Sequence, residues 1–156
     1  MRILGIDPGL TGGVALLRSV VDSEPLAETW ATPTIKIDKK NNLNVPAMVS
    51  IVMDAKPDRC FIERVSAMPK QGVSSTFNFG MGFGIWLGIL GTLQIPYTMV
   101  HSSRWKPAMG LRGQPKSASL LMVSQLFPSV SLPRAKDEGQ AEALLIAEYG
   151  RRSMAR

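Results

Sequence analysis

Acidic residues close two apolar segments of this chain and open a late helix. Asp7 ends the first apolar run, and Glu63 ends another. An ionised carboxylate costs several kcal/mol to bury without a partner, so an acid at the end of a hydrophobic strand indicates a bound cation. The candidate catalytic residues are Asp7, Glu63, Asp137, Glu138 and Glu142.

These residues offer oxygen ligands only. The chain contains one His and one Cys, which form no zinc-ligand spacing, so the set favours Mg²⁺ or Mn²⁺. Phosphodiester hydrolysis by two metal ions requires carboxylates that converge on the ion pair. The sequence therefore predicts a two-metal hydrolytic site. The candidate metal ligands are Asp7, Glu63, Asp137 and Glu142.

The acids of the late helix leave alternatives open. Glu138 and Glu142 are four residues apart and share one face if the helix includes both, whereas Asp137 can join them only from just outside the first turn. Asp137 or Glu138 also fits a simpler role, because acids in the first turn interact favourably with the helix macrodipole. Glu142 fits that role less well, since it lies in an otherwise apolar run.

The elements that position these acids follow from hydrophobic periodicity. We expect strands near 3–6, 14–18, 26–32, 59–63 and 95–100. We expect helices near 45–53, 76–93, 116–127 and 138–150. A strand, a helix and a second strand in succession favour a parallel crossover and an α/β fold.

The connecting segments carry further expectations. Residues 33–44 are polar and poorly patterned, which predicts a flexible loop that touches a polyanion, and residues 101–106 predict a polar turn. Gly80, Gly84 and Gly88 recur every four residues, so they share one helix face, which we expect to pack against the sheet.

Composition limits the class of protein. The 156 residues suit a single domain spanning 1–156, and the net charge of +6 favours an anionic partner. Residues 104–156 hold 9 basic and 4 acidic groups, so the positive excess is C-terminal. A lone buried cysteine, no cleavable signal, and an apolar stretch at 85–93 too short for a bilayer predict a soluble intracellular protein without a membrane partner.

The order of motifs resembles the RuvC family of Holliday junction resolvases. The resemblance rests on Leu4-Gly5-Ile6-Asp7-Pro8-Gly9, then Phe61-Ile62-Glu63, a glycine-rich helix, and Ala141-Glu142-Ala143-Leu144-Leu145-Ile146-Ala147. It implies a ribonuclease H-like fold, with a mixed central sheet and helices on both faces. It also implies a homodimer that uses two Mg²⁺ or Mn²⁺ ions per site to nick four-way DNA junctions in pairs.

Trp105-Lys106 and the ending 146–152 look most like the short RuvC-like proteins of phages and prophages. That likeness implies phage or prophage DNA recombination in the bacterial cytoplasm. Within the family pattern, Asp7 matches the first catalytic acid, Glu63 the second and Glu142 the last, where bacterial enzymes mostly have Asp. Gly139 stands where those enzymes have an acid or His, so Asp137 or Glu138 must serve instead.

The resemblance also implies residues that contact DNA. Met68 and Phe77 are candidate wedges against unstacked bases at the junction centre. A basic tail is expected at about 151–156. The candidate phosphate contacts are Lys70, Arg104, Lys106, Arg112, Lys116, Arg134, Lys136, Arg151 and Arg152.

Three other interpretations compete with a strict junction resolvase. One widens the substrate to branched DNA in general, including forks and flaps. Another keeps junction binding but loses catalysis, because the last acids depart from the family pattern. An actin-like ATPase is disfavoured, because 156 residues are too few for two nucleotide-gripping lobes and no phosphate-binding Gly-Lys-Ser/Thr motif occurs.

Overall fold

A five-stranded mixed sheet forms the centre of the molecule, seen in a computed structural model that describes residues 1–19, 25–66 and 72–155. The strand order is β3-β2-β1-β6-β7, with β1 to β3 antiparallel and β6 and β7 parallel to β1. The strands are β1 (Arg2–Asp7), β2 (Gly13–Arg18), β3 (Leu26–Ala31), β6 (Arg59–Glu63) and β7 (Tyr97–Val100).

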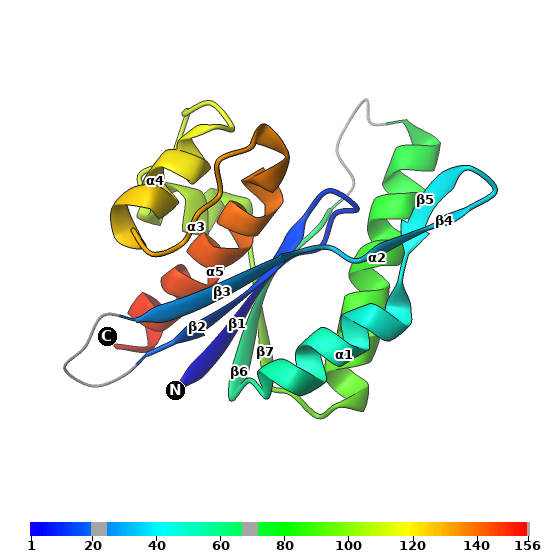
Figure 1. Cartoon of the computed structure of the whole chain (residues 1–156), viewed down its shortest axis with the longest axis horizontal. Coiled ribbons are helices and arrows are strands. Elements are labelled where there is room, and N and C mark those ends of the chain that lie inside the picture. The colour runs from blue at the N-terminus through cyan, green and yellow to red at the C-terminus, as the bar shows by residue number, and fades with distance from the viewer. Residues whose placement is uncertain (20–24, 67–71, 156) are drawn as a thin grey trace.

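Helices cover both faces of this sheet, as the resemblance implied (Figure 1). One face carries α1 (Val45–Ala55) and α2 (Val73–Thr92). The other carries α3 (Ser102–Ala108), α4 (Ala118–Leu126) and α5 (Glu138–Met154), the last preceded by a short 3₁₀ turn at Ala135–Asp137.

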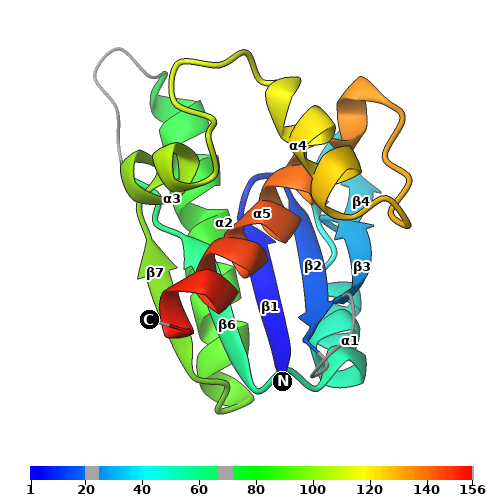
Figure 2. The same ribbon diagram turned by 90° about the vertical axis from the view of Figure 1, so that its left-hand side faces the viewer.

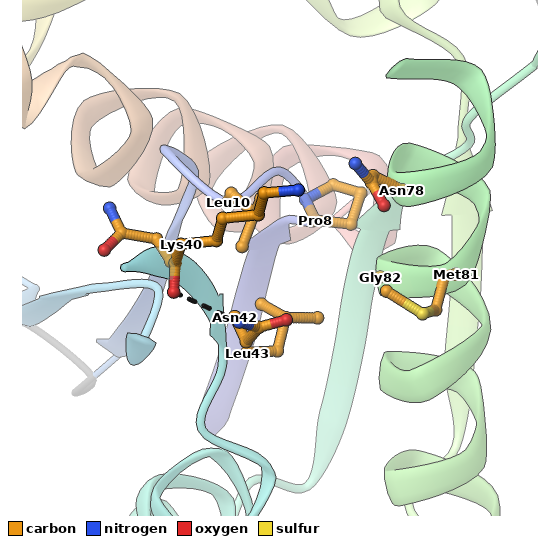
Figure 3. Close-up of a pocket in the computed structure, with 9 residues that line it drawn as sticks. Pro8, Leu10, Lys40, Asn42, Leu43, Asn78, Met81 and Gly82 are labelled. Carbon is orange, nitrogen blue, oxygen red and sulfur yellow. Dashed lines mark hydrogen bonds between the residues drawn. The ribbon is translucent and has the colours of Figure 1, made fainter. Parts of the chain in front are cut away.

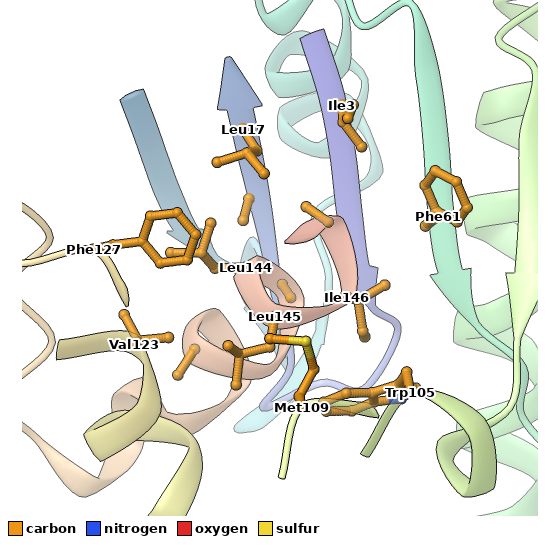
Figure 4. Packing of buried hydrophobic residues seen from close by; sticks show 14 of the residues in the cluster. Ile3, Leu17, Phe61, Trp105, Met109, Val123, Phe127, Leu144, Leu145 and Ile146 are labelled. Carbon is orange, nitrogen blue, oxygen red and sulfur yellow. The ribbon is translucent and has the colours of Figure 1, made fainter. Parts of the chain in front are cut away.

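The alternation of side chains along β1 divides the core into two clusters. Leu4 and Ile6 pack with the helices α1 and α2, whereas Ile3 packs with α5 in the cluster that Figure 4 shows. Successive strand residues point to opposite faces, so Asp7 shares the α5 face with Ile3. In β6, Phe61 belongs to the α5 cluster, and Glu63 follows it on the same face.

Helix α5 crosses β1 at close range, in front of β1, β2 and β6 (Figure 2). A Cβ at Gly5 would clash with the backbone of α5 at Ala143 and Ala147, so glycine permits this approach. The helix itself buries a nearly continuous run from Ala143 to Glu148. The close packing fixes the first turns of α5 next to the end of β1.

The segment 33–44 is a β-hairpin and not the flexible loop that its polarity predicted. β4 (Thr34–Ile37) and β5 (Lys40–Leu43) pair antiparallel, apart from the main sheet. Asp38 and Lys39 close the hairpin with φ values of 48° and 64°, the left-handed geometry that two-residue hairpin turns require. Ile35 and Ile37 alternate with polar residues in β4, but this pattern covers only four residues and β5 does not continue it.

Two further segments are more helical than expected. Residues 101–106, predicted as a polar turn, lie mostly in α3 (Ser102–Ala108), which buries Trp105. Helix α5 continues to Met154, so the expected basic tail is helical for most of its length. Arg151 and Arg152 extend the helix because both form ion pairs with Glu148 one turn earlier.

Helix α2 corrects two expectations. Gly80, Gly84 and Gly88 face away from the sheet, where an added Cβ would meet no atom within 4 Å. The sheet side is filled by large residues instead, including Trp86 and Leu90. With 20 residues, α2 is also long and apolar enough to cross a membrane by length and composition, contrary to the short stretch expected.

Candidate active site

Three carboxylates from three elements converge at the C-terminal end of β1. Ile6 pairs with Ile62 in the parallel register, so Asp7 and Glu63 follow side by side at the ends of their strands. Both point to the α5 face, where Glu142 lies on the second turn of the helix. The carboxyl ends of parallel strands are where α/β sheets place their sites. The structure thus brings together three of the five acids that the sequence singled out.

Burial and the repulsion of neighbouring acids disfavour the charged forms of Asp7 and Glu63. Burial, followed by the charge of Glu142, raises the pKa of Asp7 from 3.8 to about 6. Burial, with the charges of Asp7 and Glu142, raises the pKa of Glu63 from 4.5 to about 7. The backbone N–H of Gly9 donates to Asp7 at 3.5 Å and offsets part of its shift. A cation at this position would relieve the repulsion.

Lys106 supplies a positive charge inside the cluster. Its Nζ donates to Glu142 Oε1 at 2.9 Å and lies 5.1 Å from the ring centroid of Trp105. Burial lowers the pKa of Lys106, but the hydrogen bond and charge of Glu142, with the charges of Glu63 and Asp7, outweigh burial and raise it. Lys106 is therefore a member of the acid cluster, beyond the phosphate contact that the sequence predicted.

The donor set fits a hard divalent cation in kind, because all three side chains offer carboxylate oxygens whose charges repel one another. Within residues 1–19, 25–66 and 72–155, no group of three His, Cys, Asp or Glu side chains is close enough to hold an ion as it stands. In this arrangement Glu142 is ion-paired with Lys106 at 2.9 Å. Glu142 would exchange Lys106 for a metal ion to complete the site.

Asp137 is not brought to the other acids. Its carboxylate accepts hydrogen bonds from the backbone N–H and the guanidinium of Arg134 at 2.9 to 3.1 Å. The hydrogen bond from Arg134 lowers the pKa of Asp137, although burial opposes the shift. Gln140 also donates to it, at 3.4 Å. Its assignment as a metal ligand stays a prediction and would require release from Arg134.

Glu138 differs from Asp137 in lying within α5. Helix α5 begins at Glu138, so Glu138 and Glu142 share one face one turn apart. Gly139 lies between them in a contact so close that an added Cβ would clash with Thr11 and Gly12. The close backbone contact in this chain therefore excludes a side chain at residue 139, where the resemblance led us to expect an acid or His.

The candidate DNA contacts fall into separate places. Lys106, Arg112 and Lys116 surround the acid cluster, lining two adjoining surface hollows between α3 and α4. Arg151 and Arg152 lie at the other end of α5, bound to Glu148.

The other candidate DNA contacts lie in several different parts of the chain. Arg104 and Lys136 are exposed on α3 and the 3₁₀ turn, and Arg134 is paired with Asp137. Phe77 is 69% exposed on the first turns of α2, as a wedge requires. Met68 and Lys70 lie outside the described residues. All these roles stay predictions.

The sequence analysis missed the electrostatic role of Lys106. The available signal was its place shortly after β7, because that strand is parallel to β1 and β6 and ends at the same edge of the sheet. The predicted turn at residues 101–106 did not indicate where Lys106 would point. In the structure this segment is part of the seven-residue helix α3, from which Lys106 reaches Glu142.

Comparison with known proteins finds the fold but no sequence family. No protein-family model matches the chain, and no curated protein matches it. Solved structures, in contrast, match the chain. Thermus thermophilus RuvC is 16% identical, with a TM-score of 0.71 over 99% of this chain and 97% of that one.

Two other resolvase structures are similar. The yeast mitochondrial Holliday junction resolvase Ydc2 is 15% identical, with a TM-score of 0.58 over 99% of this chain and 80% of that one. The fowlpox virus resolvase, solved with substrate Holliday junction DNA, is 12% identical, with a TM-score of 0.60 over the full length of both chains. The chain therefore has the RuvC-like, ribonuclease H-like fold that the sequence predicted.

Proposed function

We propose that this protein is a metal-dependent endonuclease that resolves four-way DNA junctions by paired symmetric nicks. The observation that carries the proposal is the convergence of Asp7, Glu63 and Glu142 at one end of the sheet, in a fold shared with Holliday junction resolvases. The proposal extends to phage or prophage DNA in the bacterial cytoplasm, where the sequence resemblance points.

Asp7, Glu63 and Glu142, with Glu138 or Asp137, would hold Mg²⁺ or Mn²⁺, two ions per site. Such ions activate water and stabilise the leaving oxygen of a phosphodiester. The protein's own contribution is to bury the carboxylates and to aim them from two strands and a helix. Each of these elements is fixed by the core, so the site is held on rigid structure.

Basic side chains beside the acids fit a phosphate backbone. Lys106, Arg112 and Lys116 lie on the segment from α3 to α4, and the charges of Lys106 and Lys116 already act on Asp7. Their positive charges would balance the approach of a phosphodiester to the acidic site. Binding through such contacts depends strongly on salt.

A homodimer is part of the proposal. Helix α2 presents an exposed face in which Gly84 and Gly88 lie on the same side as the large apolar residues Val73 and Met81. Small residues on such a face allow a second backbone to approach closely. A two-fold dimer carries two equivalent sites, which suits paired nicks in a four-way junction.

The test is cleavage of an immobile, end-labelled four-way junction in Mg²⁺ and separately in Mn²⁺, with three-way and flap substrates alongside. We expect symmetric paired nicks on the four-way junction, lost in Asp7→Asn while junction binding persists. Equal rates on all substrates would replace the proposal with a broader branched-DNA endonuclease. Junction binding without nicks in either metal would leave a binding module.

A further inference from the structure

The indole of Trp105 is buried near the acid cluster with its N–H unpaired. The residue is fully buried, and its Nε1 has no hydrogen-bond partner among the described residues. A buried donor without an acceptor costs free energy, so such a group in a native structure calls for an explanation. The ring packs with Met109 in the apolar cluster on the α5 face (Figure 4), where neighbouring side chains offer the N–H no acceptor.

The fold brings this indole to the same end of the sheet as Glu63. Glu63 is paired with Val100 in the register of β6 and β7, and α3 begins two residues after Val100. The backbone N–H of Trp105 donates to the His101 carbonyl at 3.1 Å and closes the first turn of α3. Trp105 joins the cluster on the α5 face, which is the face to which Glu63 points.

The indole already acts on the charge of Glu63. Burial raises the pKa of Glu63, and the Trp105 N–H is among the groups that oppose this rise. The two groups are therefore near each other, although they form no hydrogen bond of ordinary geometry. A small movement of either side chain would complete one.

Consecutive residues of α3 thus act on two different acids. Lys106 Nζ donates to Glu142 at 2.9 Å, while the indole of Trp105 acts on Glu63. Lys106 also lies over the Trp105 ring, 5.1 Å from its centroid, so the two side chains support each other. Helix α3 is therefore placed to orient the acid at the end of β6 as well as the acid on α5.

We propose that Trp105 is a positioning residue for the metal site: when Glu63 binds the ion through one carboxylate oxygen, the indole N–H donates to the other. The inference rests on the proposed function, because it concerns the ion of the same site. Carboxylates that bind metals are commonly held by such hydrogen bonds, and their loss costs roughly 10- to 100-fold in metal affinity. The same bond would satisfy the buried donor of Trp105.

Trp86 provides a matched control across the sheet. It is also fully buried, and its Nε1 also lacks a partner within the part of the chain that the structure describes. It lies on α2 one turn after Gly82, which lines a pocket between that helix and the β4–β5 hairpin (Figure 3). This pocket and the cluster around Trp86 lie on the α1 and α2 face, whereas the acids point to the α5 face.

The experiment measures Mn²⁺ affinity by titration calorimetry in the full-length wild type, Trp105→Phe and Trp86→Phe. Each substitution removes one buried, unpaired N–H, and phenylalanine keeps an aromatic ring in its place. We expect Mn²⁺ to bind Trp105→Phe at least tenfold more weakly than the wild type. Trp86→Phe should bind Mn²⁺ as the wild type does. Circular dichroism checks that both variants are folded.

A second measurement uses the wild type and does not require Trp105→Phe to fold. The chain contains three tryptophans, so ¹⁵N-labelled protein gives three indole N–H signals. Trp30→Phe and Trp86→Phe assign two of them and leave the third for Trp105. On addition of Mg²⁺, the Trp105 proton signal should move downfield, as a new hydrogen bond to a carboxylate requires. The Trp86 signal should stay in place.

The outcomes separate this inference from the proposed function. Mn²⁺ affinity that is unchanged in Trp105→Phe, or reduced equally in Trp105→Phe and Trp86→Phe, would overturn the role of Trp105 and leave the endonuclease proposal standing. A Trp105 signal that does not move in saturating Mg²⁺ would do the same. Wild-type protein that binds neither ion in the millimolar range would overturn both proposals.

Discussion

Asp7 and Glu63 are buried as neighbours, and Glu142 adds a third negative charge opposite them. Among the described residues, only Lys106 supplies a cation within hydrogen-bonding distance of Glu142. Without a bound metal ion, the crowded acids therefore lower the stability of the fold, a cost that is common at functional sites. The raised pKa values of Asp7 and Glu63 reflect this cost in stability. Two measurements at the scale of single residues follow.

Replacing Asp7 should stabilise the metal-free protein at high pH. An acid whose pKa is raised by folding stabilises the protein at pH values below its ordinary pKa. This contribution is lost as the pH rises to the pKa in the folded state, which for Asp7 means between pH 3.8 and about 6. In the presence of a chelator at pH 8, we expect the free energy of unfolding of Asp7→Asn to exceed that of the wild type by roughly 1 to 3 kcal/mol. The difference should shrink at pH 5.

Thermal unfolding of both proteins at the two pH values measures this difference. Glu63 provides a parallel case, because its pKa moves from 4.5 to about 7 and the same loss is expected over that interval. A variant less stable than wild type at both pH values would show that favourable contacts hold Asp7 and outweigh its repulsion by the neighbouring acids.

Lys106 should compete with metal ions for Glu142. Removing its charge in Lys106→Met leaves the acids without an internal cation, so we expect Mn²⁺ to bind roughly tenfold more tightly, a moderate effect for one neighbouring charge. Titration calorimetry measures the affinity directly. Lys36→Met, on the exposed strand β4, is the matched control. Weaker binding in Lys106→Met would mean that Lys106 organises the acids for the metal.

At the scale of elements, the junction between α5 and the turn after β1 decides the geometry of the site. Gly12 and Gly139 form a bridge, and the start of α5 rests directly on that turn. The contact sets the height of Glu142 above Asp7. It also accounts for the missing acid at residue 139, since any side chain there would push the helix off the sheet.

Gly139→Ala should therefore destabilise the fold by about 2 to 4 kcal/mol, the effect of overpacking a tight backbone contact. Gly91→Ala, at the last turn of α2 with open space around it, should instead stabilise by roughly 0.5 to 1 kcal/mol. Urea unfolding of the two variants measures both. Equal changes in the free energy of unfolding in the two variants would indicate that α5 can move away from the turn without loss of stability.

At the scale of the whole molecule, the two sheet faces have different roles. The α5 face carries the acids and the surrounding basic residues, whereas the α1 and α2 face ends in the exposed, glycine-lined side of α2. Only 22% of the most apolar window of α2 is buried. An exposed apolar face of this kind marks an interaction surface, and a second copy of the chain is the partner proposed above.

Gly84→Leu should disrupt that dimer. A leucine in the centre of a glycine face holds the second backbone away, so sedimentation velocity should show a shift from dimer to monomer. Four-way junctions should then be cut on one strand at a time. Leu121→Gln, on the exposed side of α4, provides the control. A dimer that persists in Gly84→Leu would place the interface elsewhere.

Much of the architecture could be predicted because local patterns follow local physics. The apolar runs before Asp7 and Glu63 predicted β1 and β6 closely, and the periodicity after residue 138 predicted most of α5. Patterns failed where burial did not shape the sequence. In the exposed hairpin at 34–43 the alternation is confined to the four residues of β4 and is absent from β5, and the glycine positions of α2 were compatible with either face.

The sequence alone determined which acids are candidates for the site, because a carboxylate at the end of an apolar strand is costly to bury unless a cation binds it. Only the tertiary structure decided how they meet. Strand register set Asp7 beside Glu63, the close passage of α5 brought in Glu142, and Arg134 withdrew Asp137 from the set. The pocket between the hairpin and α2 was equally invisible in sequence. Each depends on contacts between residues far apart in the chain, which side-chain spacing within one element cannot encode.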